Sequence, residues 1–421
     1  MDNKVTNKIV KFTENIVSGK DFSKNEILST LKLVKQSDRN FNIYKGILIL
    51  YYFSKFRDVP DKKFERLKTD ENFTKCTSLL DGNTLSPPEI GGIFLNILTI
   101  PNSNGEYRDI LAGCFYGALW PFMNNPQNFD TAVDYGIAII KSAFSLDNFN
   151  VKKKLNIGKN KAKVISLAGS GKKETKLLNI SSMAAIITAA VGKAIGENIV
   201  VEKTISRATS SITGSSDIFE FLGVNIDIPI HKMADISLKA GLGTFDINTI
   251  VPKLNHVYDG RLYNVQVFAG LVGGAAIVNP IDVDLINYGL TRGSTKLCLA
   301  ILSKLYPDKN IIVLQGKNPT GEPVVDQVSV AADTEIAQMI RRQNNFGTVT
   351  PRDFGFDYRP FKYVETAQNS KENLREFIKL LTGQGNKELE HAVAMEVSLN
   401  LKGLGITDDL AAGANLTLQV I

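Results

Sequence analysis

The chain is 421 residues long, and 43% of its residues are hydrophobic, 22% charged and 8% aromatic. This length allows two or three folding units, and the composition excludes a wholly disordered, collagen-like or coiled-coil protein. Three widely separated cysteines exclude a disulfide framework and a zinc ribbon. The first residues lack the apolar core of a signal peptide and no run of about 18 apolar residues follows, so we expect a cytoplasmic protein with no membrane partner.

The formal net charge of +6 is unevenly distributed along the chain. Residues 1–75 contain 16 basic and 10 acidic residues and therefore carry the whole excess. A second concentration of positive charge, in which Glu174 is the one acid, consists of Lys152, Lys153, Lys154, Lys159, Lys161, Lys163, Lys172, Lys173 and Lys176. Such a run attracts anions, although a solvated connector has the same composition.

An internal repeat with an offset of 63 residues organises the N-terminal part of the chain. Residues 18–27 match residues 81–90, and both segments contain Ser-x-x-Glu before an apolar run. This pattern is typical of a capping box at the start of a helix. Further matches at the same offset pair Tyr44, Ile47, Leu48 and Phe53 with Tyr107, Ile110, Leu111 and Tyr116. We therefore predict an extra N-terminal helical repeat in residues 1–75, followed by a helical domain in residues 76–150.

From about residue 160 onward, short β-branched runs alternate with helical patterns. The runs predict strands at 164–167, 199–201, 226–230, 263–268 and 311–314. The helical patterns predict helices at 180–194, 217–222, 294–306, 335–343, 370–381 and 388–402. This alternation is typical of parallel βαβ units. Residues 151–421 are therefore predicted to form an α/β domain with a mostly parallel sheet, flanking helices and C-terminal helices.

A glycine-containing segment at residues 168–182 joins a predicted strand to a predicted helix. Backbone amides at such a turn, the helix N-terminus and the lysines Lys172 and Lys173 can all bind a phosphate group. The segment is not a Walker A loop, because no Gly stands five residues before Gly171 and Lys172 is not followed by Ser or Thr. A plain strand-to-helix connection is the alternative interpretation.

A second segment, residues 203–217, follows the next predicted strand and is rich in hydroxyl groups. It carries Lys203 and Arg207, and Asp217 is expected to cap the helix that follows. Both cationic loops lie at the carboxyl ends of predicted parallel strands, where open α/β sheets bind ligands. The two segments therefore predict a site for phosphate or pyrophosphate.

Six motifs, taken in order, resemble those of the anthranilate phosphoribosyltransferases and their relatives among the pyrimidine nucleoside phosphorylases, over about residues 76–421. Residues 169–179 resemble GTGGD-x5-N, and residues 179–182 resemble N-[IV]-S-T. Residues 203–207 resemble KHGNR, and residues 214–217 resemble GSAD or GSSD. Residues 326–329 resemble D-E-[IV]-S, and residues 349–355 resemble ITPEDFG.

The resemblance implies a pentosyltransferase that uses phosphoribosyl pyrophosphate and Mg²⁺ and that forms a homodimer through its helical domain. It implies catalytic roles for Lys203, Arg207 and Asp326, and magnesium contacts at Ser181, Asp326 and Gln327. The substrate-binding positions that it implies are Gly169, Ser170, Gly171, Lys172, Lys173, Asn179, Ser181, Ser182, Thr204, Ser206, Ser215, Thr244 and Leu254.

Several of these positions depart from the family pattern. Lys172 and Lys173 replace a Gly and an acid, and Thr204 and Ser206 replace the His and Asn of KHGNR. Gln327 replaces a second metal carboxylate, and a neutral amide binds magnesium more weakly. Positions that hold an acceptor-binding His and Arg in the family are Thr244 and Leu254, so bidentate recognition of a carboxylate is lost.

We therefore expect a divergent phosphoribosyltransferase with an unknown small acceptor other than anthranilate. One alternative is a non-catalytic relative that binds nucleic acid or another polyanion through the lysine-rich segment. The other is nucleoside phosphorylase-like activity, since one fold hosts several chemistries. Residues 261–264 faintly resemble a phosphorylase segment, but the Arg expected shortly after it is Gln266.

Overall fold

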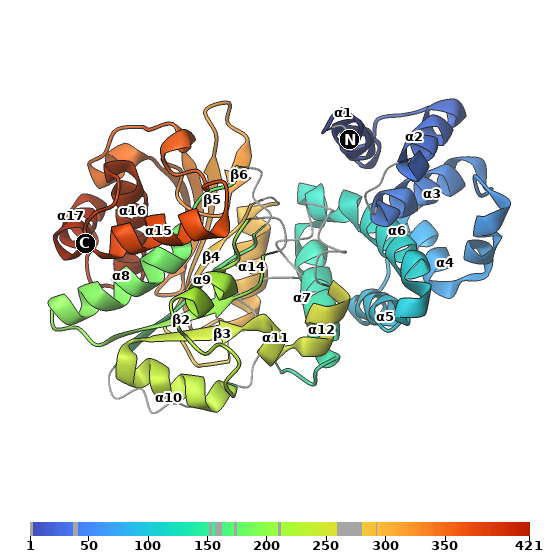
Figure 1. Ribbon diagram of the computed structural model, residues 1–421. Helices are drawn as coiled ribbons and strands as arrows, with labels where there is room; N and C mark the ends of the chain where they lie inside the picture. The colour runs from blue at the N-terminus through green and yellow to red at the C-terminus, as the bar shows by residue number, and fades with distance from the viewer. Residues whose placement is uncertain are drawn as a thin grey trace. The chain divides into compact units, whose positions relative to one another are not determined.

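The computed structural model describes residues 3–36, 41–150, 154–155, 162–171, 175–208, 212–258, 280–291 and 293–421. These residues divide into two compact units. Unit 1 holds residues 3–148 and 256–258 of the described chain, and unit 2 holds the remainder (Figure 1). No helix in the described ranges is both long and apolar enough to cross a membrane.

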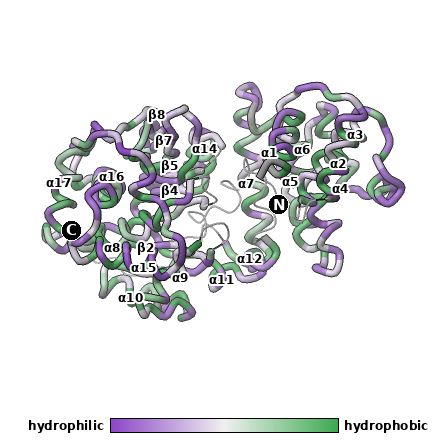
Figure 2. Tube along the Cα trace, turned by 45° about the horizontal axis from the view of Figure 1, so that its top comes forward, coloured by the Kyte–Doolittle hydropathy of each residue, from purple (hydrophilic) through white to green (hydrophobic). Residues whose placement is uncertain are grey.

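Unit 1 is built from helices, and Figure 2 shows hydrophobic and hydrophilic stretches alternating along them. The helices are α1 (Asn3–Val17), α2 (Lys24–Gln36), α3 (Asn42–Phe56), α4 (Glu71–Leu80), α5 (Pro87–Leu98), α6 (Gly105–Asn124) and α7 (Phe129–Ser145). Both predicted capping boxes are present. The amide of Ser23 donates to Glu26 Oε2 at 2.8 Å at the start of α2, and the amide of Ser86 donates to Glu89 Oε2 at 2.8 Å at the start of α5. The consecutive helices α2 and α3 thus correspond to α5 and α6 at the offset of the predicted repeat.

The two predicted copies pack together through α3 and α6. A Cβ atom on Gly46 would lie 2.0 Å from the carbonyl oxygen of Ile110, and one on Gly113 would lie 1.9 Å from that of Ile43. The Sγ of Cys114 also donates to the carbonyl oxygen of Gly46 at 3.3 Å. Such close backbone approach is possible only where both helices lack a side chain at the crossing. Glycine at these two positions therefore lets the backbones of α3 and α6 approach closely.

Unit 2 contains a sheet with the strand order β3-β2-β1-β4-β5-β7-β8, and β6 also pairs with β5. The strands are β1 (Lys163–Gly169), β2 (Ile199–Ile205), β3 (Leu242–Asp246), β4 (Leu285–Gly289), β5 (Asn310–Lys317), β6 (Pro323–Val325), β7 (Thr334–Ile340) and β8 (Gln343–Val349). From β3 to β5 the pairs are parallel, whereas β6, β7 and β8 pair in antiparallel fashion. The predicted mostly parallel sheet is confirmed.

Helices cover the sheet of unit 2 on both faces, with α14 on the face opposite α8 and α16 (Figure 1). The helices are α8 (Ile180–Ala194), α9 (Ser215–Phe221), α10 (Ile230–Ala240), α11 (Ile247–Ile250), α14 (Thr295–Leu305), α15 (Ser370–Leu381), α16 (Lys387–Gly403) and α17 (Leu410–Val420). Helix α12 (Pro252–Tyr258) begins in the residue range of unit 2 and ends in that of unit 1. The main core joins Leu285 and Ile312 of the sheet to α8 and α16. A Cβ on Gly403 of α16 would lie 2.5 Å from Leu285, so this helix lies directly on the strands.

Two sequence predictions in unit 2 are wrong. Residues 226–230 form no strand, because Pro229 lacks an amide hydrogen and instead precedes α10, while the strand lies at Leu242–Asp246. Residues 335–343 are not helical but belong largely to β7, which pairs with β5 and β8. The expected capping of α9 by Asp217 is present, because its side chain in the first turn accepts a 2.7 Å hydrogen bond from the amide of Gly214. The strand predicted at 263–268 lies outside the described residues.

Candidate functional site

The loop after β1 is hydrogen-bonded to Asp326, which follows β6. The amide of Gly171 donates a 2.8 Å hydrogen bond to Asp326 Oδ2. A Cβ on Gly169 would lie 2.5 Å from the same oxygen, and a Cβ on Gly289, the last residue of β4, would lie 1.8 Å from the carbonyl oxygen of Asp326. Glycines at the ends of two adjacent parallel strands therefore make room for this carboxylate.

Ser170 joins the loop after β1 to the loop after β4. Its amide donates to the carbonyl oxygen of Gly289 at 2.8 Å. Its hydroxyl oxygen accepts a 2.8 Å hydrogen bond from the amide of Thr291, whose own hydroxyl donates to the carbonyl oxygen of Gly171 at 2.5 Å. These bonds hold the glycine-containing turn in place. Lys172 and Lys173, predicted to bind substrate, lie outside the described residues.

Ser181 and Asp326, which are far apart in the sequence, line the same small cavity. Ser181 lies in the first turn of α8, whose N-terminal end presents partial positive charge. The cavity is also lined by Asn287 of β4 and by Glu396 and Asn400 of α16. The Nδ2 of Asn287 donates to Asn400 Oδ1 at 2.7 Å, which ties the strand to the helix. Two of the three predicted magnesium contacts are thus brought together.

Gln327, the third predicted magnesium contact, is not among the residues that line this cavity. Its side chain is 1% exposed, and its carbonyl oxygen lies where a Cβ on Gly316 would approach within 2.4 Å. The described residues form no group of three or more His, Cys, Asp or Glu that could hold a metal ion by itself. Magnesium in proteins is commonly bound by one or two carboxylates together with substrate phosphates, so this donor set fits a cation shared with a phosphorylated ligand.

Lys203 lies on β2, between β3 and β1. Its ammonium group donates to the carbonyl oxygens of Leu167 at 3.3 Å and Thr204 at 3.0 Å, and the residue is 3% exposed. Leu167 is its register partner on β1 and also lines the cavity that holds Asp326. A cation therefore lies beside the carboxyl end of β1, as the sequence predicts.

Hydroxyl groups organise the loop between β2 and α9. The amide of Ser206 donates to Ser215 Oγ at 3.1 Å, and the amide of Ser216 donates to the carbonyl oxygen of Ser206 at 3.1 Å. Asn179, immediately before α8, donates through Nδ2 to the carbonyl oxygen of Thr213 at 3.3 Å. The predicted positions in the two cationic segments are therefore linked to each other. Ser182 differs, because its side chain is buried in α8.

Arg207 binds acidic side chains of α9. Both terminal nitrogens contact the carboxylate of Glu220, with Nη2 to Oε1 at 2.8 Å, and Nη1 lies 3.3 Å from Asp217 Oδ1. The Arg207 side chain is 51% exposed. A phosphate group at this position would therefore compete with Glu220 for the guanidinium group.

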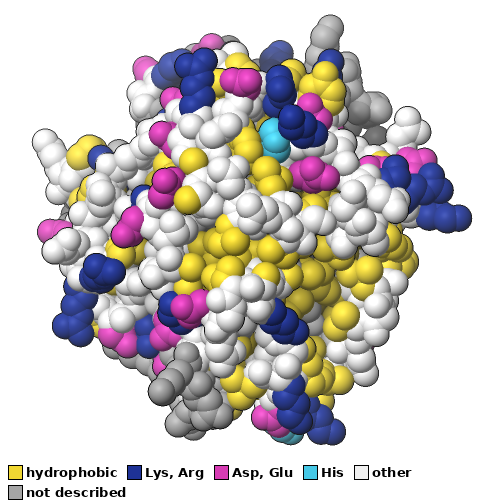
Figure 3. Space-filling view, turned by 90° about the vertical axis from the view of Figure 1, so that its left-hand side faces the viewer, with side chains coloured by type: hydrophobic (Ala, Val, Ile, Leu, Met, Phe, Trp, Pro, Cys, Tyr) yellow, Lys and Arg dark blue, Asp and Glu magenta, His cyan; other side chains and the backbone are white. Residues whose placement is uncertain are grey.

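Thr244 and Leu254, the predicted acceptor positions, are both buried. Thr244 is the register partner of Lys203 on β3, and its hydroxyl lies 3.9 Å from Met233 Sδ. It lines an apolar groove between α8 and α10 and not the cavity of Asp326. Figure 3 shows a broad gathering of hydrophobic side chains on the face of the molecule that it views. Neither Thr244 nor Leu254 supplies a charged partner for a carboxylate.

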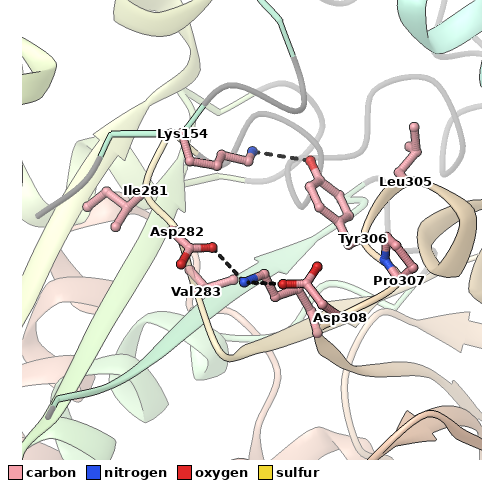
Figure 4. Close-up of a pocket in the computed structure, with 9 residues that line it drawn as sticks. Lys154, Ile281, Asp282, Val283, Leu305, Tyr306, Pro307 and Asp308 are labelled. Atoms are coloured by element: carbon pink, nitrogen blue, oxygen red, sulfur yellow. Dashed lines mark hydrogen bonds and ion pairs between the residues drawn. The ribbon is translucent and has the colours of Figure 1, made fainter.

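A second polar pocket lies at the opposite, amino-terminal end of the strands, where chain segments enter β4 and β5 (Figure 4). Lys154 Nζ lies 3.2 Å from the hydroxyl oxygen of Tyr306, and Lys309 Nζ contacts Asp282 at 2.6 Å and Asp308 at 2.8 Å. Lys163, on β1, pairs with Glu197 at 3.2 Å. Lys154 and Lys163 of the lysine-rich segment therefore have partners within unit 2.

Glu396, Asn287, Asn400 and Thr291 were not identified from the sequence as site residues. They belong to no motif, and Glu396 lies on a C-terminal helix far along the chain from Asp326. The sequence did contain one indication that Glu396 has a polar environment, because it is the only charged residue in the apolar stretch 392–399. An isolated acid in a buried helical run indicates a polar environment in the fold.

A mostly parallel sheet with glycine turns, a helix N-terminus and a buried carboxylate at the strand ends is an arrangement with which α/β proteins commonly bind phosphorylated ligands. The chain belongs to the glycosyl transferase family, a/b domain, whose family-wide sequence profile matches residues 161–421. The predicted membership among the relatives of anthranilate phosphoribosyltransferase is confirmed.

Two curated relatives illustrate the similarity in sequence. The anthranilate phosphoribosyltransferase of Aeropyrum pernix is 26% identical over 259 residues, which cover 61% of this chain and 71% of the relative. That of Histophilus somni is 25% identical over 256 residues, covering 61% of this chain and 72% of the relative.

Solved structures agree with the fold. The anthranilate phosphoribosyltransferase of Thermus thermophilus superposes with a TM-score of 0.62 at 20% identity, over 82% of this chain and 93% of that chain. The enzyme of Saccharomyces cerevisiae, in complex with phosphoribosyl pyrophosphate and Mg, gives a TM-score of 0.64 at 16% identity, over 83% and 93%.

Proposed function

We propose that this chain binds phosphoribosyl pyrophosphate at the carboxyl ends of β1, β2 and β4 and transfers the phosphoribosyl group to an acceptor other than anthranilate. The convergence of Ser181 and Asp326 on one cavity, beside the turn formed by Gly169 and Gly171, is the observation that carries this proposal. Family membership supports it, as does the complex of the yeast relative with phosphoribosyl pyrophosphate and Mg.

The chemistry requires charge neutralisation, because pyrophosphate leaves from a sugar carbon that becomes positively charged. Backbone amides after β1 and the N-terminal end of α8 bind phosphate oxygens, and Lys203 adds a buried positive charge. Ser181 and Asp326 would hold Mg²⁺, which neutralises the departing pyrophosphate. No covalent nucleophile is needed.

The acceptor is expected to lack a carboxylate that must be recognised. Arg recognises carboxylates through two parallel hydrogen bonds, and Leu254 replaces it with a buried apolar side chain. Thr244 can form a hydrogen bond but carries no charge. Anthranilate would therefore bind without a cationic partner at these positions.

Pyrophosphate release from phosphoribosyl pyrophosphate tests this assignment. We expect no release above the buffer rate with anthranilate, and release with an acceptor found by screening nucleobases and aromatic amines that lack a carboxylate. Asp326→Asn is the matched control, since the amide oxygen can still accept the Gly171 hydrogen bond while the charge is lost. Release with anthranilate at the rate of the best acceptor would contradict the proposed specificity.

The alternative of a nucleic-acid-binding relative is less well supported. A row of free cations would be needed along a phosphate backbone. Lys154 and Lys163 instead have partners within unit 2. A homodimer through the helices of unit 1 remains part of the proposal, and sedimentation velocity of the full chain tests it directly.

A further inference from the structure

Glu396 is a carboxylate in an apolar helix. It is 6% exposed, and its neighbours along α16 include Val393, Met395 and Val397, which are buried in the core. Burying a carboxylate costs free energy unless hydrogen bonds or a nearby cation compensate for the lost water. The amide of Val328 donates to Glu396 Oε1 at 2.5 Å, which fixes one side of the carboxylate next to the segment that carries Asp326.

Glu396 and Asp326 line the same small cavity from different elements, together with Ser181. Two carboxylates at one cavity repel each other, so a cation bound between them lowers the free energy of the pair. The three groups are all oxygen donors, which is the ligand type that Mg²⁺ and Mn²⁺ prefer. The cavity thus offers two carboxyl groups and a hydroxyl group as oxygen donors.

Gln327 cannot provide the second charge, because its side chain is a neutral amide. We infer that Glu396 supplies the second carboxylate of the divalent-cation site, together with Asp326 and in place of an acid at position 327. This inference rests on the proposed function, since the cation is the one that accompanies pyrophosphate. It assigns a role to Glu396 beyond accepting the hydrogen bond of Val328.

Binding of Mn²⁺ to the full chain, measured by electron paramagnetic resonance with and without inorganic pyrophosphate, tests the inference. The variant is Glu396→Gln, whose amide oxygen can still accept the Val328 hydrogen bond. Its control is Glu390→Gln on the same helix, which removes an acid that does not line the cavity. We expect Glu396→Gln to weaken Mn²⁺ binding in the presence of pyrophosphate by about tenfold or more, as loss of a charged ligand does.

The melting temperature separates a cation ligand from a structural residue. Glu396→Gln with an unchanged melting temperature and weakened Mn²⁺ binding supports the inference, and Glu390→Gln is expected to match the wild type in both. If Glu396→Gln does not fold, Glu396→Asp takes its place, because withdrawing the carboxylate by one methylene group is also expected to weaken binding.

The outcomes distinguish this inference from the proposed function. Equal Mn²⁺ affinity in the wild type and the folded Glu396 variant overturns the inference alone, and the proposed transferase stands. A wild-type protein that binds no Mn²⁺ with pyrophosphate overturns the inference and the magnesium assignment together. Binding of phosphoribosyl pyrophosphate, measured separately, then decides whether the transferase proposal survives.

Discussion

The amide of Gly171 donates a 2.8 Å hydrogen bond to Oδ2 of Asp326, which lies 155 residues later in the chain. This bond couples the glycine turn after β1 to a carboxylate that follows β6, and both belong to motifs that resemble one family. The position of Asp326 therefore depends on the backbone at the ends of β1 and β4.

Gly289→Ala is predicted to displace Asp326. The added Cβ would lie 1.8 Å from the carbonyl oxygen of Asp326, so the backbone must shift. We expect a loss of about 1–3 kcal/mol in the free energy of unfolding and a weaker affinity for phosphoribosyl pyrophosphate. Denaturant unfolding and calorimetry measure the two effects. Gly347→Ala on exposed β8 is the control, because its Cβ would meet no atom within 4 Å; equal behaviour of the two variants would contradict the argument.

Glu220→Gln is predicted to release Arg207 for an anionic ligand. Glu220 contacts both terminal nitrogens of this exposed arginine, and such surface pairs contribute about 0–1 kcal/mol. Affinity for inorganic pyrophosphate should therefore rise by up to about fivefold. Calorimetry checks this. Glu376→Gln, which breaks the surface pair with Lys379, is the control. Unchanged or weaker binding in Glu220→Gln would show that Arg207 does not meet the ligand.

Gly113→Ala is predicted to destabilise unit 1. Its Cβ would lie 1.9 Å from the carbonyl oxygen of Ile43 at the contact between α3 and α6, so the helices must separate. Gly92→Ala, inside α5 with no atom within 4 Å of its Cβ, is expected to stabilise by about 0.5–1 kcal/mol through helix propensity. Thermal unfolding of the full chain compares them. A melting temperature for Gly113→Ala at or above that of the wild type would refute the close packing of the two copies.

Glu202→Gln is predicted to change how stability depends on pH. Burial holds the pKa of Glu202 well above its ordinary value, while nearby Lys154 lowers it in part. The stabilising contribution of a raised carboxyl pKa is present below about pH 4.5 and is lost as pH rises toward the folded-state value. The variant should therefore match the wild type near pH 4 and become increasingly more stable than the wild type as pH rises.

Melting temperatures between pH 4 and pH 8 check this prediction, with the exposed Glu322→Gln as control. Lys154 reinforces the trend, because burial lowers its pKa to about 8 and Glu202 opposes that shift. Removing Glu202 lowers the pKa of Lys154 further, which again favours the variant at higher pH. A difference between variant and wild type that shrinks with rising pH would contradict the account.

Much of the fold could be predicted from local sequence patterns, and the wrongly predicted elements have physical explanations. Helices α8 and α15 begin and end at the residues that their helical patterns predict. Residues 226–230 imitate a strand through alternating isoleucines, although Pro229 prevents regular pairing. The helical spacing of Ile336, Met339 and Ile340 is overridden by pairing of β7 on both edges, which no local pattern contains.

Contiguous motifs were enough to propose Gly169, Ser181 and Lys203 as site residues, and their roles stay predictions. The contribution of Glu396 and Asn400 to the lining of the cavity could not be predicted, because it depends on how α16 packs against β4 and β5. The ion pair between Arg207 and Glu220 could not be predicted from the sequence either, because it forms only when α9 packs beside the loop after β2.

Calorimetric titration of the full chain with phosphoribosyl pyrophosphate, with and without Mg²⁺, tests the central claim most directly. The account predicts binding that is strengthened by Mg²⁺ and is lost in Asp326→Asn. Absence of heat with this ligand under both conditions, or binding that is indifferent to Mg²⁺ and to Asp326, would contradict it.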